Sequence, residues 1–111
     1  MRVTSSLWVG AYVRRCFAEG AFAAVVRHGA EEAGAIFVVV DRLNGSADLY
    51  GPAPQATFIE SRPSERMFQR IAAEEPLVAV NARIEREAQF DPDLWVVSID
   101  DRDGRSFLDT V

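Results

Sequence analysis

The sequence predicts an α+β fold, a mostly antiparallel β-sheet with two helices packed on it. Two stretches repeat their apolar residues at the spacing of an amphipathic helix, and two others carry apolar residues on both faces, as in strands buried on both sides. An Asn-Gly pair and an Asp-Gly pair follow strands, where hairpin turns are expected. The 111 residues, 49% of them hydrophobic, suit a single domain over residues 1–111 with its own core.

The first predicted helix runs from about Ser5 to Glu19. Thr4 or Ser5 can cap its N-terminus, and Gly20 ends it. At about 3.6 residues per turn, one face of this helix is apolar and places the cysteine in the core. The residues of that face are Val9, Val13, Cys16 and Phe17.

The next elements are predicted to be strands. The β-rich stretch from Phe22 to His28 is one, and the run from Ala35 to Leu43 is a central one because it is apolar on both faces. The pair Asn44-Gly45 then turns the chain into a hairpin partner, Ala47 to Tyr50.

Residues 55–73 leave alternatives open. Thr57-Phe58-Ile59 could extend the meander of strands, and the stretch 65–73 could be a strand or a short helix capped by Ser64. The apolar residues of 65–73 have helical spacing, whereas its position in a meander favours a strand. We predict a strand there.

The second helix is predicted from about Pro76 to Ala88, because proline suits the first turn and Asp91-Pro92 ends the pattern. Leu94 to Asp100 is a second strand that is apolar on both faces. The pair Asp103-Gly104 is predicted to turn it into a second hairpin, with a return strand from Arg105 to Leu108.

Two strands that are buried on both faces need cover on both sides of the sheet. Either the two helices lie on opposite faces, or a partner covers one face. The second arrangement leads us to predict a homodimer.

Composition excludes several classes of function. The net charge of −5 predicts no nucleic-acid partner, and the twelve basic residues are all arginine, which excludes a Schiff-base lysine and a P-loop lysine. Cys16 and His28 are single residues of their kind, so one chain can form neither a disulfide nor a His/Cys zinc cluster. With no membrane-length apolar run and no signal peptide, we expect a cytoplasmic protein that has no cofactor and binds no membrane.

One flank of the first helix is a candidate interface. Trp8, Tyr12, Arg15 and Glu19 follow one another at helical spacing beside its apolar face. Tryptophan, tyrosine and arginine are common anchors of protein interfaces. The alternative is that Trp8 and Tyr12 widen the core contact while Arg15 pairs with Glu19.

Acidic residues between positions 91 and 103 are weak candidates for a metal site. Carboxylates can bind Mg²⁺ or Ca²⁺, but the spacing here does not match an EF-hand loop. The structural alternative is stronger, since Asx turns, hairpin turns and pairing with Arg102 or Arg105 account for these acids. The candidates are Asp91, Asp93, Asp100, Asp101 and Asp103.

Several stretches together resemble the small alphaproteobacterial proteins known as domain of unknown function 1491. They are Leu7-Trp8-Val9, Arg14-Arg15-Cys16, Ala33-Gly34-Ala35, Asp48-Leu49-Tyr50-Gly51-Pro52, Arg83-Ile84-Glu85-Arg86-Glu87, Phe90-Asp91-Pro92-Asp93-Leu94-Trp95-Val96-Val97 and Asp100-Asp101-Arg102-Asp103-Gly104-Arg105. The resemblance covers nearly the whole chain, and Phe-Asp-Pro-Asp-Leu-Trp is its most specific part. It implies a bacterial cytosolic protein of one domain and no assigned activity.

We therefore predict a non-enzymatic protein-interaction or homo-oligomeric module, with self-association or another protein as its partner. The alternative is a small divalent-metal-binding domain or enzyme that uses the acids from Asp91 to Asp103, with Arg14 or Arg15 as an anion clamp. No catalytic residue is assigned.

Overall fold

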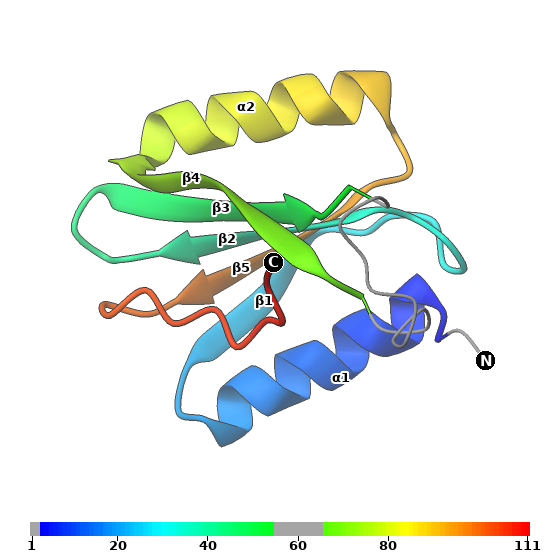
Figure 1. Cartoon of the computed structure of the whole chain (residues 1–111), viewed down its shortest axis with the longest axis horizontal. Helices are drawn as coiled ribbons and strands as arrows, with labels where there is room; N and C mark the ends of the chain where they lie inside the picture. Colours follow the sequence, from blue (N-terminus) through cyan, green and yellow to red (C-terminus); the bar gives the residue numbers. More distant parts are fainter. Residues whose placement is uncertain (1–2, 55–65) are drawn as a thin grey trace.

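The computed structural model describes residues 3–54 and 66–111 (Figure 1). In chain order the elements are α1 (Ser5–Ala18), β1 (Phe22–Arg27), β2 (Ile36–Asp41), β3 (Ser46–Pro52), β4 (Phe68–Pro76), α2 (Leu77–Phe90) and β5 (Trp95–Asp100). The strand considered at Thr57-Phe58-Ile59 and the helix cap considered at Ser64 lie outside the described residues. Among the described residues, no helix has the length and apolar character needed to cross a membrane.

The strands form one sheet in the order β1-β5-β2-β3-β4. The central pair, β2 and β5, is parallel, and the other neighbouring pairs are antiparallel. Helices α1 and α2 lie on opposite faces of this sheet (Figure 1). The predicted α+β fold, a mostly antiparallel sheet with two packed helices, is confirmed.

The opposite placement of the helices explains why β2 and β5 are apolar on both faces. In β2, Val38 and Val40 face the α1 side while Val39 faces the α2 side; in β5, Val97 and Val96 divide in the same way. The first of the two arrangements considered, with the helices on opposite faces, is therefore the observed one, and the apolar strands give no support to the predicted homodimer. Self-association needs a different argument.

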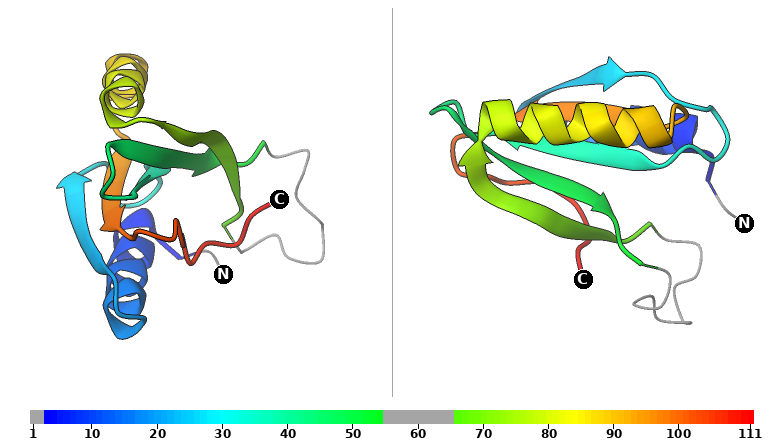
Figure 2. Two further views of the ribbon diagram at one scale, coloured as in Figure 1. Left: turned by 90° about the vertical axis from the view of Figure 1, so that its left-hand side faces the viewer. Right: turned by 90° about the horizontal axis from the view of Figure 1, so that it is seen from above.

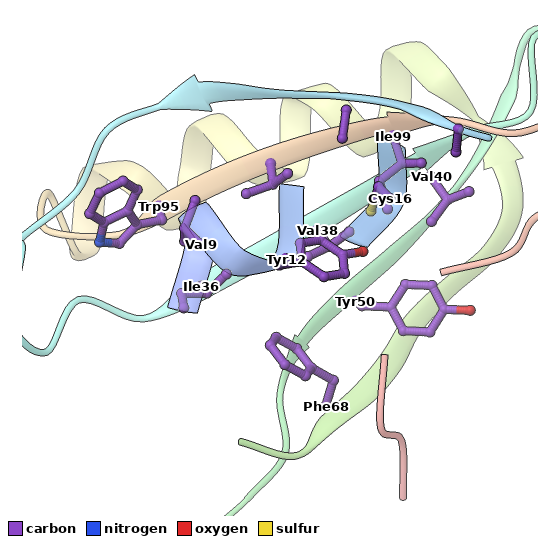
Figure 3. Packing of buried hydrophobic residues seen from close by; sticks show 13 residues of the cluster. Val9, Tyr12, Cys16, Ile36, Val38, Val40, Tyr50, Phe68, Trp95 and Ile99 are labelled. Atoms are coloured by element: carbon purple, nitrogen blue, oxygen red, sulfur yellow. The ribbon is translucent and has the colours of Figure 1, made fainter. Parts of the chain in front are cut away.

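The core on the α1 side is built around three residues of that helix, Val9, Tyr12 and Cys16 (Figure 3). The prediction was right for Val9 and Cys16 but wrong for Phe17, whose side chain is 52% exposed. Tyr12 lies one turn before Cys16 and fills the inward position, whereas Phe17 is rotated toward the outside. Its ring instead meets that of Phe22 edge to face, with the ring centres 5.6 Å apart.

Helix α2 covers the other core with a narrow apolar stripe. Val80 and Ile84 are buried against residues of β2, β3 and β5. The helix begins directly after Pro76 and ends two residues beyond the predicted Ala88, at Phe90. Its outer face is exposed and carries the charged residues Arg83, Glu85 and Arg86 together with the apolar residues Val78 and Phe90.

The stretch 68–76 is a strand, so the favoured alternative for 65–73 is confirmed over its described part and the helix is wrong. The apolar residues of this stretch have helical spacing, but it forms a strand because it pairs with the edge of β3 that β2 leaves free. Two shifts of register interrupt this pairing near Leu49.

The first hairpin is confirmed, and the second is wrong. β2 and β3 pair antiparallel across Asn44-Gly45, and β3 continues beyond Tyr50 to Pro52. No described strand follows β5, because β1 and β2 already occupy both of its edges. The stretch 105–108 therefore crosses toward β4, where the Phe68 amide donates to the carbonyl of Asp109 at 2.9 Å.

Candidate functional site

The predicted interface residues of α1 lie along one flank of the helix but at different depths. Tyr12 is buried, Trp8 is half-buried, and Arg15 and Glu19 are exposed. The Trp8 ring stacks on Tyr12 with the ring centres 4.8 Å apart and lies 5.3 Å from the ring of Phe68. The two aromatic residues are thus part of the core contact, while Arg15 and Glu19 remain available at the surface.

A cavity of about 300 Å³ lies beside this flank. Trp8, Tyr12 and Arg15 form one wall, and Phe107 and Leu108 of the C-terminal segment form the opposite wall. The Tyr12 hydroxyl donates a hydrogen bond to the carbonyl of Ser106, which holds the segment against the helix. The sequence did not predict this cavity, since its two walls are almost a chain length apart.

The buried groups beneath the cavity stay neutral. Burial raises the pKa of the Cys16 thiol, and it raises the pKa of the neighbouring Tyr12 hydroxyl. A protonated, fully enclosed thiol is a poor nucleophile and metal ligand. His28 lies elsewhere, exposed at the end of β1 with its ring 4.2 Å from that of Trp95. The structure therefore does not pair Cys16 with His28.

The five acidic candidates do not converge. Within the part of the chain that the structure describes, no three carboxylate, thiol or imidazole side chains are placed to share a metal ion. Asp91 accepts a hydrogen bond from the Asp93 amide in an Asx turn. The Asp101 carboxylate is tied to Arg105 by a 2.7 Å salt bridge and also accepts from the Arg105 amide. These contacts match the structural alternative from the sequence.

Sequence reasoning missed the outer edge of β1. This strand pairs with β5 alone among the described residues, and Figure 2 shows its other side open. Three of its side chains are large, apolar and well exposed: Phe22 at 57%, Val25 at 42% and Val26 at 66%. The available signal was the run Phe-Ala-Ala-Val-Val, which has no charge before Arg27.

A groove of about 500 Å³ separates this edge from α2. Its floor includes Val39 and Val96 of the central strands, and its two sides include Ile84 of α2 and Val26 of β1. Arg27, on the same side as Val26, donates from Nη2 to the carbonyl of Pro92 at 3.1 Å, while its buried Nε has no hydrogen-bond partner. The α2 face of the sheet is thus incompletely covered next to β1.

The opposite edge of the sheet, β4, is protected. Its first residue, Phe68, forms backbone hydrogen bonds with the C-terminal segment. The strand exposes the charged residues Arg70, Glu74 and Glu75 along its length and ends at Pro76. Charges, proline and irregular pairing are the usual means by which proteins block the addition of a further strand. In β1 there is only one irregularity, at Val26, and the charge comes last.

Comparison with known proteins identifies the family. The family model described as "Protein of unknown function (DUF1491)" matches residues 3–109. A solution structure of a protein from A. tumefaciens is similar, with 43% identity and a TM-score of 0.84, covering 100% of this chain and 96% of that one.

A crystal structure of a DUF1491 family protein from Caulobacter crescentus has 38% identity and a TM-score of 0.80, covering 100% of this chain and 99% of that one. An NMR structure of a DUF1491 family protein from the same organism gives the same identity and TM-score, with 98% of that chain covered. No curated protein matches the sequence. The chain belongs to the DUF1491 family of proteins of unknown function.

Proposed function

We propose that this protein is a non-enzymatic protein-interaction module that accepts an extended protein segment along the outer edge of β1. The observation that carries the proposal is the open edge with its exposed side chains Phe22, Val25 and Val26. An exposed, apolar and uncharged sheet edge otherwise invites aggregation, so a partner that covers it accounts for its persistence.

When a segment adds to a sheet edge as a further strand, backbone groups of the edge provide the affinity and side-chain pockets provide the selectivity. The unpaired backbone amides and carbonyls of β1 can bind the backbone of an incoming strand, whereas pockets beside the edge select its side chains. The groove between β1 and α2, with Val26 and Ile84 on its sides, provides such a pocket.

The chemistry of the described residues supports a binding role over catalysis. The pKa of the Cys16 thiol is raised by burial, and Asp101 is held by Arg105. A single buried thiol also suits the reducing cytoplasm, where we propose that the protein acts. No observation favours the metal-binding alternative.

The proposal is tested by comparing what the whole protein captures from a lysate of its own bacterium with and without a charge on the edge. Val26→Glu places a carboxylate on β1, and Val78→Glu, on the exposed face of α2, is the matched control. We expect bound proteins, the chain itself included, to be lost with Val26→Glu and kept with Val78→Glu. The same captured proteins with both variants would overturn the proposal.

Hydrogen exchange gives an independent measure of the site. When the wild type is saturated with a captured protein, amides of β1 should exchange more slowly than in the free chain, because outward amides gain acceptors. Slower exchange confined to α1 or α2 would place the interaction elsewhere and contradict the proposed site.

A further inference from the structure

We infer that the partner at the β1 edge is a second copy of this chain, paired antiparallel about a two-fold axis at Ala24. The inference rests on the proposed function and deepens it by naming the occupant. Joining two copies in this way would make one continuous sheet across both chains, with a self-complementary contact as two-fold symmetry requires. The charges and the side-chain sizes along β1 both favour this contact.

The charges at the ends of β1 favour an antiparallel copy. The strand has no charge from Phe22 to Val26, so its own sequence is as neutral as the surface that it would cover. Glu19 precedes the strand and Arg27 ends it. Antiparallel pairing turns each basic end toward the acidic end of the partner, whereas parallel pairing would set like charges side by side.

The sizes of the side chains select the register. Residues opposite each other in an antiparallel pair lie on the same face of the sheet. A two-fold axis perpendicular to the sheet must therefore lie midway between one residue and its own copy in the partner strand. With the axis at Ala24, the small side chain stands at the closest approach. Phe22 of one copy then faces Val26 of the other. By symmetry this contact occurs twice, so the two most exposed side chains of the strand are covered in both copies.

The local structure of β1 allows this pairing. The stretch Phe22–Val25 keeps a regular register with β5 and can extend the ladder on either side of Ala24, whereas Val26 lies within the bulge, so its side chain meets Phe22 of the other copy only at the end of the paired stretch. Phe17 contacts Phe22 edge to face at the same edge and extends the apolar surface beyond the strand. The protected edge, β4, offers no equivalent surface, which restricts the contact to β1.

Sedimentation velocity over a concentration series tests the occupant. We expect the wild type to shift from the mass of one chain toward twice that mass as concentration rises. Val26→Glu should raise the dimer dissociation constant at least tenfold, since each copy loses a buried apolar contact, and Val78→Glu should not change it. Circular dichroism checks that both variants remain folded.

A cysteine placed on the axis tests the register. Opposite residues of an antiparallel pair have Cα atoms about 4.5–5.5 Å apart, within the range that a disulfide can bridge. Ala24→Cys should therefore form a covalent dimer under mild oxidation, and Ala82→Cys, exposed on α2, should not. The native Cys16 is fully buried and does not compete.

The outcomes separate this inference from the proposed function. A wild type that stays monomeric at every concentration overturns the second copy, as does a dimer that Ala24→Cys fails to cross-link. If Val26→Glu nevertheless abolishes capture of another protein from the lysate, the β1 edge still functions as a docking site and only the occupant is wrong. If Val26→Glu changes neither sedimentation nor capture, both proposals fail together.

Discussion

The side chain of Asp48 in β3 accepts a hydrogen bond of 2.7 Å from the backbone amide of Glu74 in β4. Its second oxygen accepts from Arg42, at 3.2 Å from Nε and 2.8 Å from Nη2. The Asp48 side chain is fully enclosed, and Glu74 has a positive φ of 49° where the register of the two strands shifts. The carboxylate therefore replaces a ladder partner that the irregular pairing takes away from Glu74.

We predict that Asp48→Ala lowers the free energy of unfolding by at least about 2 kcal/mol. The variant leaves the Glu74 amide without its acceptor inside the enclosed Asp48 site and takes the carboxylate away from Arg42. Urea unfolding followed by circular dichroism measures the change. Glu74→Gln is the control, since that side chain is 64% exposed and its contact with Arg42 is long, at 3.8 Å. Its effect should stay within about 0.5 kcal/mol. Equal effects of the two variants would contradict the structural role of Asp48.

Gly34 is predicted to tolerate no side chain. A Cβ atom there would overlap the carbonyl oxygen of Asp93 and lie 2.9 Å from Cδ1 of Trp95. Gly34→Ala should therefore lower the free energy of unfolding by about 1–3 kcal/mol, because the backbone at Asp93 would have to move. Gly10→Ala is the matched control: the helix leaves room there, and alanine should stabilise it by up to about 1 kcal/mol. Thermal unfolding should show a lower Tm for Gly34→Ala and a higher Tm for Gly10→Ala than for the wild type.

Trp8→Ala separates the two interpretations of the α1 flank. Because Trp8 is half-buried and stacks on Tyr12 and near Phe68, we expect the variant to lose up to about 3 kcal/mol of stability. Its dimer dissociation constant should match that of the wild type, since the proposed contact lies on β1. An unchanged stability with lost self-association, measured by urea unfolding and sedimentation, would instead assign Trp8 to an interface.

The sequence was sufficient for elements whose signal is local. Apolar periodicity located both helices, and stretches that are apolar on both faces located β2 and β5. The order of strands in the sheet was beyond this reasoning, because β5 enters between β1 and β2 through contacts far apart in the chain. The false second hairpin has the same cause: Asp103-Gly104 makes a turn, but no free edge of β5 remains for a return strand.

The candidate sites show the same division. Helical spacing placed Trp8, Tyr12 and Arg15 on one flank, yet only the fold brings Phe107 opposite them. The openness of the β1 edge depends on where the other elements lie, so its uncharged sequence alone could not distinguish an edge from an interior strand.

The ion pair of Asp101 and Arg105 makes part of the stability depend on pH. Hydrogen bonds from the Arg105 side chain lower the pKa of the Asp101 carboxyl in the folded chain. In the unfolded chain the pKa of this carboxyl is about 3.9. A carboxyl whose pKa is lower when folded contributes its stabilisation above the unfolded value, and the contribution disappears as pH falls through the folded value. At neutral pH the contribution is therefore fully present.

We predict that Asp101→Asn melts below the wild type at pH 7 and that the difference in Tm shrinks as pH falls below about 4. The closing gap follows because wild-type Asp101 becomes protonated there and then differs little from asparagine. Asp103→Asn is the control for the loss of one acidic charge, since Asp103 is exposed two residues away. Thermal melts between pH 7 and pH 3 measure both. A difference for Asp101→Asn that stays constant with pH would mean that Arg105 does not stabilise the charged carboxylate in solution.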